Sequence, residues 1–491
     1  MKPVPDGRIQ RLNEARPDPM GEYVLYWMTA QRRLGWNFAL DRACYWAHEL
    51  GRPLLIFEAV RAAYPWASPR HHAPIMIGMH EHAVALDGTG VGYFPYVEPA
   101  PGDGDGLLHA LAARAACVVT DDAPTFFTPR LVDAASRLES TYAEAVDSCG
   151  VLPLREPGRT FSAAFHFRRH LHKVLRDHVM VAPSPDPLAQ LRVPALGGLP
   201  TSVTERWPAT TRSALEALHF PRLGSTTPVV GGIGGTIAGR RRLDTFLSTR
   251  LSRYADDRNH PDLDVVSGLS PWLHYGHIST HEVLAALFSA EEWTPNRLSE
   301  RADGRRAGWW GMSPSAEAFV DQLVTWRELG FGFAHFEPDY TTYESLPEWA
   351  RVTLEDHAPD PREHLYSLDA FDAAETHDDL WNAAQRQLRT EGVIHNYLRM
   401  LWGKKILEWS AGPREALDIM IELNNCYSVD GRDPNSYSGI FWTMGRFDRG
   451  WPERAIFGKV RSMTSASTRR KVKLTRYLER FGEGGTQLGL L

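Results

Sequence analysis

Cysteine is scarce in this chain of 491 residues. Its four cysteines, Cys44, Cys117, Cys149 and Cys426, lie far apart, and no two of them form a CxxC pair. We therefore expect neither a disulfide-rich scaffold nor a structural zinc module. Isolated cysteines also favour a reducing compartment, which predicts a cytoplasmic protein.

Long apolar runs and a strong charge of one sign are missing as well. No uninterrupted apolar segment reaches the roughly 20 residues of a membrane-spanning helix, and residues 1–19 lack the apolar core of a secretory signal. The 54 basic and 60 acidic side chains leave a net charge of −6, which by itself does not indicate a nucleic-acid partner. The length predicts two or three domains.

The first part of the chain alternates short apolar segments with helical patterns. Four segments predict buried strands: residues 23–29, 53–60, 116–122 and 150–154. A helix is expected to end at Gly51, because glycine is a typical C-terminal cap. This alternation predicts a parallel α/β domain at residues 20–160, followed by a connection rich in Pro, Gly and Ser at 161–235.

Tryptophan is frequent in the second half, where eleven of the 16 tryptophans lie from Trp272 onward. There the strand signal nearly vanishes and apolar residues recur at helical spacing, which predicts an all-α domain at 236–480. The stretch from Arg446 to Arg480 carries eleven basic and three acidic side chains, a local net charge of +8. Such a patch is typical of phosphate binding, although a solvated terminal helix can have the same composition.

Two motifs resemble ligand sites only weakly. The glycine-rich residues 231–239 do not belong to a βαβ unit, so we interpret them as the end of the connection rather than as a nucleotide-binding loop. His166, His170 and His172 have helical ligand spacing, but the basic residues among them would repel a metal cation. We therefore expect no metal site.

Two further segments are more specific. Trp402 and Trp409 lie two helical turns apart on one apolar face, about 10 Å along the axis, and Trp381 lies in the preceding helical segment. Such a stripe is usually a hydrophobic core, but it would also conduct single electrons to a nearby acceptor. The turn at 430–435, DGRDPN, places two carboxylates and an arginine between apolar segments, a setting in which a polar turn often lines a site.

Five segments follow one another in the second half of the chain: SGLSPWLHYGHIS at 267–279, DLWNAAQ at 379–385, YLRMLWGKKILEW at 397–409, LNN with DGRDPNSYSG at 423–439, and WPERAIFGKVRSM at 451–463. In this order they resemble the photolyase–cryptochrome family, and in particular its class II cyclobutane pyrimidine dimer photolyases. The resemblance covers about residues 20–480. It implies a photolyase fold, with a Rossmann-like α/β antenna domain followed by an all-α FAD-binding catalytic domain.

The resemblance also implies an enzyme, a carbon–carbon lyase that repairs DNA under blue light. In the family, reduced FAD excited by light passes an electron to a pyrimidine dimer flipped out of double-stranded DNA, and the cyclobutane ring opens. An 8-hydroxy-5-deazaflavin often serves as the antenna in class II. We expect a monomer that acts on DNA and has no membrane partner.

Matching the motifs residue by residue implies a set of cofactor contacts. The FAD phosphates and ribityl chain would be held by Tyr254, Ser267, Leu269 and Ser270. Arg399 and Asp448 resemble a buried ion pair beside the flavin, and Asn424 matches the asparagine that faces flavin N5. The turn near the isoalloxazine and adenine contributes Asp430, Arg432 and Asp433.

The same matching assigns the electron and substrate contacts. Trp402 and Trp381 match the pair that photoreduces FAD, and Trp409 would extend it. Trp326 and Trp442 match two tryptophans that pack on the dimer. The DNA phosphates would be met by Arg449, Arg454, Lys459 and Arg461.

Two departures from the family pattern lie on the substrate side. Gln322 stands where the family has a glutamate that hydrogen-bonds the dimer, so a charge and a transferable proton are lost. The stretch 442–448 is one residue shorter than the class II pattern. Three functions therefore stay open: a light-driven DNA-repair lyase, a cryptochrome-type photoreceptor without repair, and a photoenzyme with a non-DNA substrate. The basic tail and the two substrate-side tryptophans favour repair, whereas the two departures favour the others.

Overall fold

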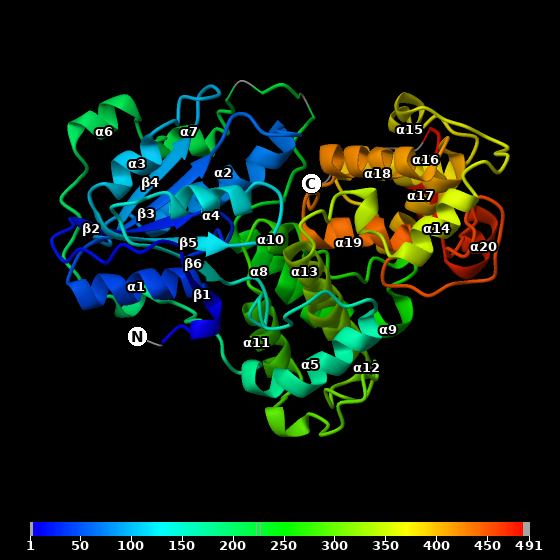
Figure 1. The fold of residues 1–491 in the computed structure, drawn as a ribbon, viewed down its shortest axis with the longest axis horizontal. Coiled ribbons are helices and arrows are strands. Elements are labelled where there is room, and N and C mark those ends of the chain that lie inside the picture. The colour runs from blue at the N-terminus through cyan, green and yellow to red at the C-terminus, as the bar shows by residue number, and fades with distance from the viewer. Residues whose placement is uncertain (1–2, 222, 226, 485–491) are drawn as a thin grey trace. The chain divides into compact units, whose positions relative to one another are not determined.

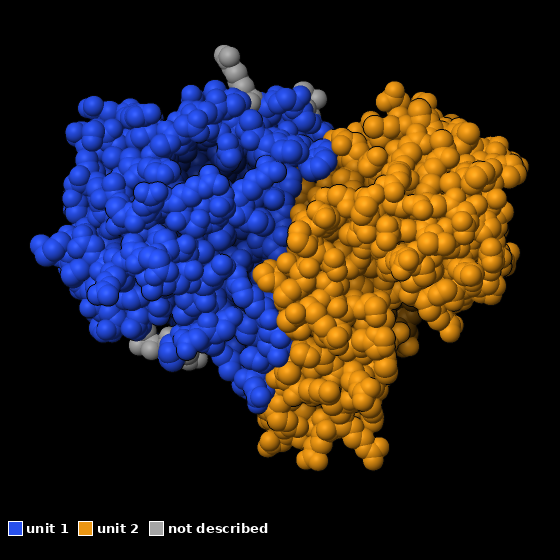
Figure 2. Space-filling view, viewed as in Figure 1, with its two compact units in different colours: residues 1–156, 177–244, 268–290 blue, residues 157–176, 245–267, 291–491 orange. Residues whose placement is uncertain are grey.

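The computed structural model describes residues 3–221, 223–225 and 227–484. The chain forms two compact units, each built from segments that are discontinuous in sequence (Figure 2). Unit 1 comprises residues 1–156, 177–244 and 268–290, and unit 2 comprises residues 157–176, 245–267 and 291–491. The borders expected for an α/β domain, a connection and a helical domain stay a prediction.

Unit 1 is built on a six-stranded sheet with the strand order β1-β6-β5-β2-β3-β4 (Figure 1). The strands are β1 Ile9–Arg11, β2 Tyr23–Met28, β3 Leu54–Val60, β4 Gly92–Val97, β5 Ala115–Asp122 and β6 Ala143–Asp147. β1 runs antiparallel to β6, and all other neighbours are parallel. β2 is buried along its whole length, as expected for a parallel sheet covered on both faces. The predicted α/β fold is confirmed, with strands close to 23–29, 53–60 and 116–122.

The strand predicted at 150–154 is wrong. These residues are buried but irregular, and the backbone carbonyls of Gly150 and Val151 accept hydrogen bonds from the side chain of Arg8. The strand lies just before them, at Ala143–Asp147, where acidic residues interrupt the apolar pattern. Glu144 is tolerated there because it accepts hydrogen bonds from the guanidinium of Arg42 at 2.6 and 3.1 Å.

The alternation of side chains along β2 divides the core of unit 1 into two layers. Even-numbered residues of β2 pack against α1 (Phe38–Leu50), and odd-numbered residues pack against α3 (Leu107–Ala112) and α4 (Thr128–Ser136). α1 begins at Asn37, whose side chain accepts two backbone N–H groups, and ends at Gly51 in the left-handed conformation, as predicted. The other helices lying mainly in unit 1 are α2 Pro69–Ala85, α6 Thr201–Arg206, α7 Arg212–Glu216, α8 Thr236–Thr245, α10 Ser270–His274 and α11 Thr280–Ala290.

Unit 2 is helical, as the periodicity of the second half predicts. Its helices are α5 Ala164–His178, α9 Tyr254–Asp257, α12 Pro314–Val320, α13 Arg327–Phe336, α14 Glu348–Asp356, α15 Leu368–Ala373, α16 Asp379–Glu391, α17 Asn396–Trp409, α18 Pro413–Tyr427, α19 Pro434–Thr443, α20 Ser465–Lys471 and α21 Thr475–Phe481 (Figure 1). π-helical turns lie at Phe246–Arg250 and Asp321–Trp326. Short 3₁₀ turns lie at Asp6–Arg8 and Leu188–Gln190 in unit 1 and at Leu251–Arg253, Pro261–Leu263, Pro295–Arg297 and Tyr343–Ser345 in unit 2. Within the described ranges, no helix is both long and apolar enough to cross a membrane.

Helix α17 is buried on nearly all sides, because nine of its 14 residues are buried and it packs against α16, α18 and α19. Gly403 permits this close packing. A Cβ at that position would lie 2.7 Å from Cγ2 of Thr443 and 3.1 Å from the sulfur of Met420. The orientation of α17 is therefore fixed, and so is the direction in which each of its side chains leaves the helix.

Candidate active site

The turn between α18 and α19 buries charged side chains. Asp430, Arg432 and Asp433 are 8%, 4% and 8% exposed, respectively. Asp433 begins α19 by accepting a hydrogen bond from the backbone N–H two residues later at 2.8 Å. Gly431 is required in the turn, because a Cβ there would lie 2.8 Å from the backbone carbonyl oxygen of Asn424. The turn thus concentrates hydrogen-bonding groups of both charges inside unit 2.

Arg399 of α17 forms its ion pair with Asp430. One guanidinium nitrogen of Arg399 lies 3.3 Å from Oδ1 of Asp430, and the Ser428 hydroxyl donates to the same oxygen at 2.5 Å. The expected pair of Arg399 with Asp448 is not formed, because Asp448 accepts two hydrogen bonds from Arg461 at 2.7 and 3.1 Å. The acid beside Arg399 therefore comes from the turn before α19 and not from the segment after it.

Asp448 organises the start of the basic tail. Burial raises the pKa of its carboxyl, but hydrogen bonds from Arg461 and from the backbone of Arg449 outweigh burial, so the net pKa lies below the usual value. The Trp451 indole also donates to Asp448 at 3.3 Å. Asp448 therefore stays ionised and ties together residues 448–461.

Hydrogen bonds link Asn424 to Asn425 and Asn425 to Tyr437. The amide nitrogen of Asn424 donates to Oδ1 of Asn425 at 3.1 Å, and the amide nitrogen of Asn425 donates to the Tyr437 hydroxyl at 3.1 Å. The backbone N–H of Arg432 donates to the same Oδ1 at 3.0 Å. Burial raises the pKa of Tyr437 to about 12, so its hydroxyl stays protonated. The side chain of Asn424 is therefore held in one orientation beside the buried turn.

Three tryptophans form a buried group between α16 and α17, here called the tryptophan path: Trp381, Trp402 and Trp409. They are 0%, 2% and 3% exposed. The rings of Trp381 and Trp409 lie 6.2 Å apart between centroids, and the Trp381 indole N–H donates to the backbone carbonyl of Trp402 at 3.0 Å. The Trp402 indole N–H donates to Oε1 of Gln385 at 2.9 Å. The structure thus brings together the three tryptophans matched from sequence. Sequence reasoning missed Gln385, although it lies one helical turn after Trp381 in the predicted helix.

Gln322 and Trp326 lie on the π-helical turn between α12 and α13. They are the two partly exposed residues of this six-residue turn, whose other four residues are buried. Within the described part of the chain, no group hydrogen-bonds the side chain of Gln322. π-helical turns are often found at functional sites. The amide of Gln322 is therefore available to a ligand.

Trp442 of α19 is flanked by two basic side chains. Nζ of Lys404 lies 5.2 Å from the ring centroid, and the guanidinium carbon of Arg461 lies 5.5 Å from it. Lys404 is fully buried, which lowers the pKa of its amine to about 7, and the amine donates to the backbone carbonyl of Thr443. Trp442 is thus positioned from one side by α17 and from another by the tail.

The residues expected to hold the cofactor phosphates are spread over both units. Tyr254 and Ser267 belong to unit 2, whereas Leu269 and Ser270 belong to unit 1. Tyr254 is buried edge-on against the ring of Phe319, at 5.7 Å between centroids. Ser270 is exposed at the first residue of α10. Their joint role stays a prediction.

Of the eleven basic side chains between Arg446 and Arg480, four form ion pairs with described acidic residues of unit 2. Ion pairs are formed by Arg446 with Glu337, Arg461 with Asp448, Arg469 with Asp379, and Arg480 with Glu391. In contrast, Arg449, Arg454 and Lys459 are exposed, and none of them forms an ion pair with a residue that the structure describes. Of the four expected phosphate contacts, Arg461 is therefore already paired.

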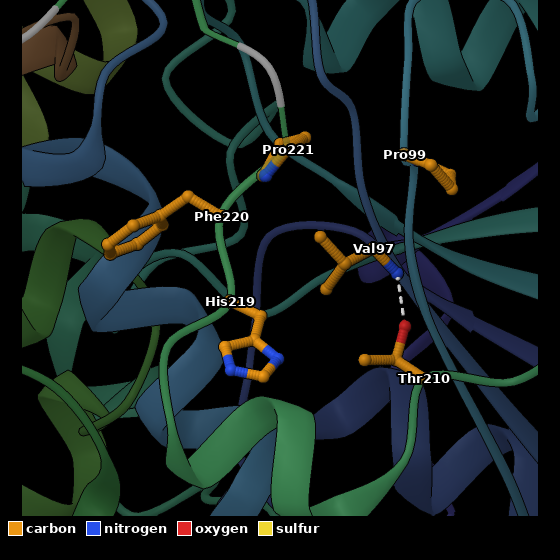
Figure 3. Close-up of a pocket in the computed structure, with 6 residues that line it drawn as sticks. All are labelled: Val97, Pro99, Thr210, His219, Phe220 and Pro221. Atoms are coloured by element: carbon orange, nitrogen blue, oxygen red, sulfur yellow. Dashed lines mark hydrogen bonds between the residues drawn. The ribbon is translucent and has the colours of Figure 1, made fainter.

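A separate cavity of about 280 Å³ lies at the carboxyl end of β4 in unit 1 (Figure 3). It is lined by Val97, Pro99, Thr210, His219, Phe220 and Pro221. The backbone N–H of Val97 donates to the Thr210 hydroxyl at 2.7 Å, which ties the segment after α6 to the strand. No residue matched from sequence lines this cavity. Among residues 3–221, 223–225 and 227–484, no group of three or more His, Cys, Asp or Glu side chains could hold a metal ion.

Solved structures share this fold. A bacterial class III photolyase from Agrobacterium tumefaciens aligns with a TM-score of 0.64 and 16% identity, covering 94% of this chain and 86% of the other. A cryptochrome from Synechocystis sp. PCC6803 aligns with a TM-score of 0.61 and 17% identity, covering 94% and 88%. The chain therefore has the photolyase fold.

The sequence has curated relatives over nearly its whole length. It is 33% identical to the deoxyribodipyrimidine photo-lyase of Methanothermobacter thermautotrophicus, covering 96% of this chain and 97% of the relative. Proteins of the same name in Arabidopsis thaliana and Oryza sativa subsp. japonica are 30% and 32% identical, covering 97% and 96% of this chain and 92% and 89% of theirs. A search of family models gave no match. On the strength of these relatives, the chain belongs to the deoxyribodipyrimidine photo-lyase family.

Proposed function

We propose that this protein is a light-driven lyase that uses FAD to split cyclobutane pyrimidine dimers in double-stranded DNA, in the manner of class II photolyases. The name of its relatives supports light-driven repair. The observation that carries the proposal is that α17 joins the Arg399–Asp430 ion pair to the tryptophan path. The four cysteines, which are few and far apart in the sequence, support a reducing, cytoplasmic location, and we propose that the protein acts as a monomer.

The buried polar group of unit 2 fits a flavin by its chemistry. An isoalloxazine ring carries several acceptor atoms and one N–H donor, and the site offers the guanidinium of Arg399, the amide of Asn424 and the carboxylate of Asp430. Buried polar groups are costly unless they are hydrogen-bonded, and these are already oriented by their neighbours. Asn424 would face flavin N5, and the adenine side would be held by Arg432 and Asp433. When bound, FAD supplies the light-driven one-electron chemistry.

The phosphates and ribityl chain of FAD would be held by Tyr254, Ser267, Leu269 and Ser270. Trp402 would donate an electron toward the flavin, and Trp381 and Trp409 would replace it. Low exposure of all three rings supports this role, because water is kept away from the charge that moves along them.

The substrate side is formed by half-buried groups. Trp326 and Trp442 would pack on the flipped dimer, because aromatic rings stack on bases irrespective of sequence. Gln322 would donate a hydrogen bond from its amide to a dimer carbonyl, where negative charge develops once the dimer has gained an electron. The exposed Arg449, Arg454 and Lys459 would contact DNA phosphates.

Gln322 also supports a second function, a cryptochrome-type photoreceptor or a photoenzyme with another substrate. An amide cannot supply the proton or the charge of the family's glutamate. The flavin side is unaffected by this substitution, so such a protein would keep FAD and lose dimer repair.

For the antenna we propose an 8-hydroxy-5-deazaflavin bound by unit 1. Four half-buried aromatic rings gather after the carboxyl ends of β3 and β5, with centroids 5.0–6.1 Å apart in their contacts: Tyr64, Trp66, Phe126 and Phe127. Ligands of open α/β sheets bind at the carboxyl ends of strands, and a planar chromophore stacks on aromatic rings.

The proposal is tested by purifying the protein, measuring flavin absorbance and illuminating it with a duplex that contains one cyclobutane dimer. We expect one non-covalent FAD per chain and light-dependent restoration of the two pyrimidines. Protein that binds FAD but does not repair the dimer would contradict the repair function and favour the photoreceptor. Protein that takes up no FAD even on reconstitution would contradict all three functions.

Trp402→Phe should strongly slow the photoreduction of bound oxidised FAD while the flavin stays bound, because phenylalanine is much harder to oxidise than tryptophan. Trp293→Phe is the matched control, since the Trp293 indole is also buried and also donates a hydrogen bond, in its case to the backbone carbonyl of Trp310 at 2.6 Å. Flavin bleaching under blue light is followed by absorbance. Equal rates in Trp402→Phe and in the wild type would mean that the path is only a hydrophobic core.

Gln322→Leu should lower the repair yield by about tenfold or more, because a hydrogen bond to a charged group contributes about 1.5–3 kcal/mol. Gln322→Glu should keep or raise the yield, since it restores the family's acid. The measurement is the repair quantum yield of the wild type and both variants on one dimer-containing duplex. Equal yields in all three would remove Gln322 from the mechanism.

Arg454→Glu combined with Lys459→Glu should weaken DNA binding for all sequences alike. If both side chains neutralise phosphates, the slope of log affinity against log salt should fall by about 1.8, at about 0.9 per contact. Arg480→Glu is the control, because Arg480 is already paired with Glu391. A slope that stays at the wild-type value in the double variant would show that these cations do not contact DNA.

A further inference from the structure

The exposed Arg454 and Lys459 lie on a short hairpin, residues 451–459, that packs against the end of helix α14. The backbone N–H of Trp451 donates to the carbonyl of Lys459 at 2.8 Å, and backbone hydrogen bonds run in both directions between Arg454 and Gly458, at 3.0 and 2.8 Å. The hairpin thus carries two of the cations that the proposed function assigns to DNA phosphates. Whatever holds the hairpin in place also determines where these two cations lie.

The tip of the hairpin has a backbone conformation that is unfavourable by itself. Ile456 has a φ of +69°, which is uncommon for a residue with a branched Cβ. Gly458 has a φ of +51°, and a Cβ there would lie 2.8 Å from Cδ2 of His357. Such conformations persist only where their surroundings impose them. One support is Thr353 of α14, whose hydroxyl accepts the backbone N–H of Lys459 at 3.0 Å.

Two further side chains, at and just after the end of α14, hold the hairpin. Oδ2 of Asp360 accepts the backbone N–H of Ile456 at 2.8 Å. His357, the residue after the last residue of α14, lies 2.6 Å through Nδ1 from the same Asp360 oxygen and 2.9 Å through Nε2 from Oε1 of Glu453. His357 therefore joins an acid of the hairpin to the acid that holds the hairpin tip.

This position between two acids requires a proton on each ring nitrogen of His357. An ionised carboxylate accepts hydrogen bonds but cannot donate one, so both nitrogens must donate, and only the imidazolium does so. The N–H of Ile456 and the ring of His357 lower the pKa of the Asp360 carboxyl, which keeps it ionised. Asp360 and Glu453 in turn raise the pKa of His357, and they are the charged groups of the described chain that act on its ring. Arg362, near Asp360, donates to two backbone carbonyls.

Glu453 needs such a partner because of where it lies. It is an acid within the basic tail and immediately precedes Arg454. An uncompensated carboxylate at this place would repel the phosphates that Arg454 is to bind. Asp448, another acid of the tail, is paired with Arg461 at 2.7 Å, and His357 compensates the charge of Glu453 in the same way. A neutral His357 would both loosen the hairpin and leave a negative charge beside a phosphate contact.

We propose that the imidazolium of His357 is a positioning residue that anchors the 451–459 hairpin to α14 and so directs Arg454 and Lys459 toward DNA phosphates. The proposal rests on the proposed function, in which these two cations contact DNA. His357 acts through the hairpin and not by touching DNA. As the pH rises through the raised pKa of His357, one ring nitrogen gives its proton to solvent, and one of the two carboxylates loses its donor. DNA affinity is therefore higher below this pKa than above it.

The anchor is tested by DNA affinity near pH 6 and near pH 9, at one salt concentration and on one dimer-containing duplex. Near pH 6, His357→Gln should bind about two- to fivefold more weakly than the wild type, the effect expected of one exposed charge pair. Near pH 9 the two proteins should bind equally, because neither then donates to both carboxylates. Their affinity ratio cancels the titration of other groups. The repair yield at saturating DNA should be the same in both.

His166→Gln is the matched control. His166 is an exposed histidine of unit 2 whose Nδ1 lies 3.1 Å from the Ser162 hydroxyl instead of lying between two carboxylates. This variant should bind DNA as the wild type does at both pH values.

A second measurement needs neither a variant nor DNA, so it holds even if His357→Gln folds poorly. Nitrogen NMR of the full chain should show both ring nitrogens of His357 protonated near pH 7. A neutral His357 at that pH would overturn the inference. His357→Gln that binds as tightly as the wild type near pH 6 would also overturn it and leave the proposed function intact. Equal DNA affinity of the wild type and of the Arg454→Glu, Lys459→Glu double variant would instead contradict the proposed phosphate contacts, and the inference with them.

Discussion

The hydrogen bond from the Trp381 indole to the backbone carbonyl of Trp402 joins α16 to α17, and much of unit 2 depends on it. The indole is 0% exposed, so leaving its N–H without a partner would cost about 1–3 kcal/mol. Only one register of the two helices gives the Trp381 N–H this partner. The same register brings Gln385 of α16 to the Trp402 indole, so the indole N–H groups of Trp381 and Trp402 are both hydrogen-bonded.

Side chains of helix α17 contact three neighbouring parts of unit 2. Arg399 reaches the turn before α19 and pairs with Asp430, and Trp402 faces α16. Lys404 reaches the carbonyl of Thr443 and the ring of Trp442 on α19. Because one rigid helix carries Arg399, Trp402 and Lys404, the turn before α19, the tryptophan path and Trp442 keep a fixed geometry relative to one another. Electron transfer is sensitive to distance, so this rigidity serves the proposed function directly.

The spacing of apolar residues in the sequence predicted the helices and the side chains that share a helical face. α16 and α17 follow from apolar residues at helical spacing, and the tryptophans of the path follow from their positions on those helices. β6 was missed because Glu144 is buried by tertiary hydrogen bonds that no local pattern reveals. The partner of Arg399 could not be predicted either, since it depends on how α17 faces the turn before α19.

The two sides of the site differ in how strongly they are tied to the fold. Asn424 and Asp430 are buried, Arg399 is partly buried, and each of them takes part in a hydrogen bond or ion pair with a buried group. Replacing any of the three therefore leaves a buried group with one partner fewer. Gln322, in contrast, points from a π-helical turn with no hydrogen bond to a described residue, and exchanging an acid for an amide there leaves the backbone and its packing unchanged. Under the proposed function, substitution is therefore inexpensive where the substrate would lie and costly where the cofactor would lie. Position 322, where the resemblance implies an acid and this chain has an amide, is of the inexpensive kind.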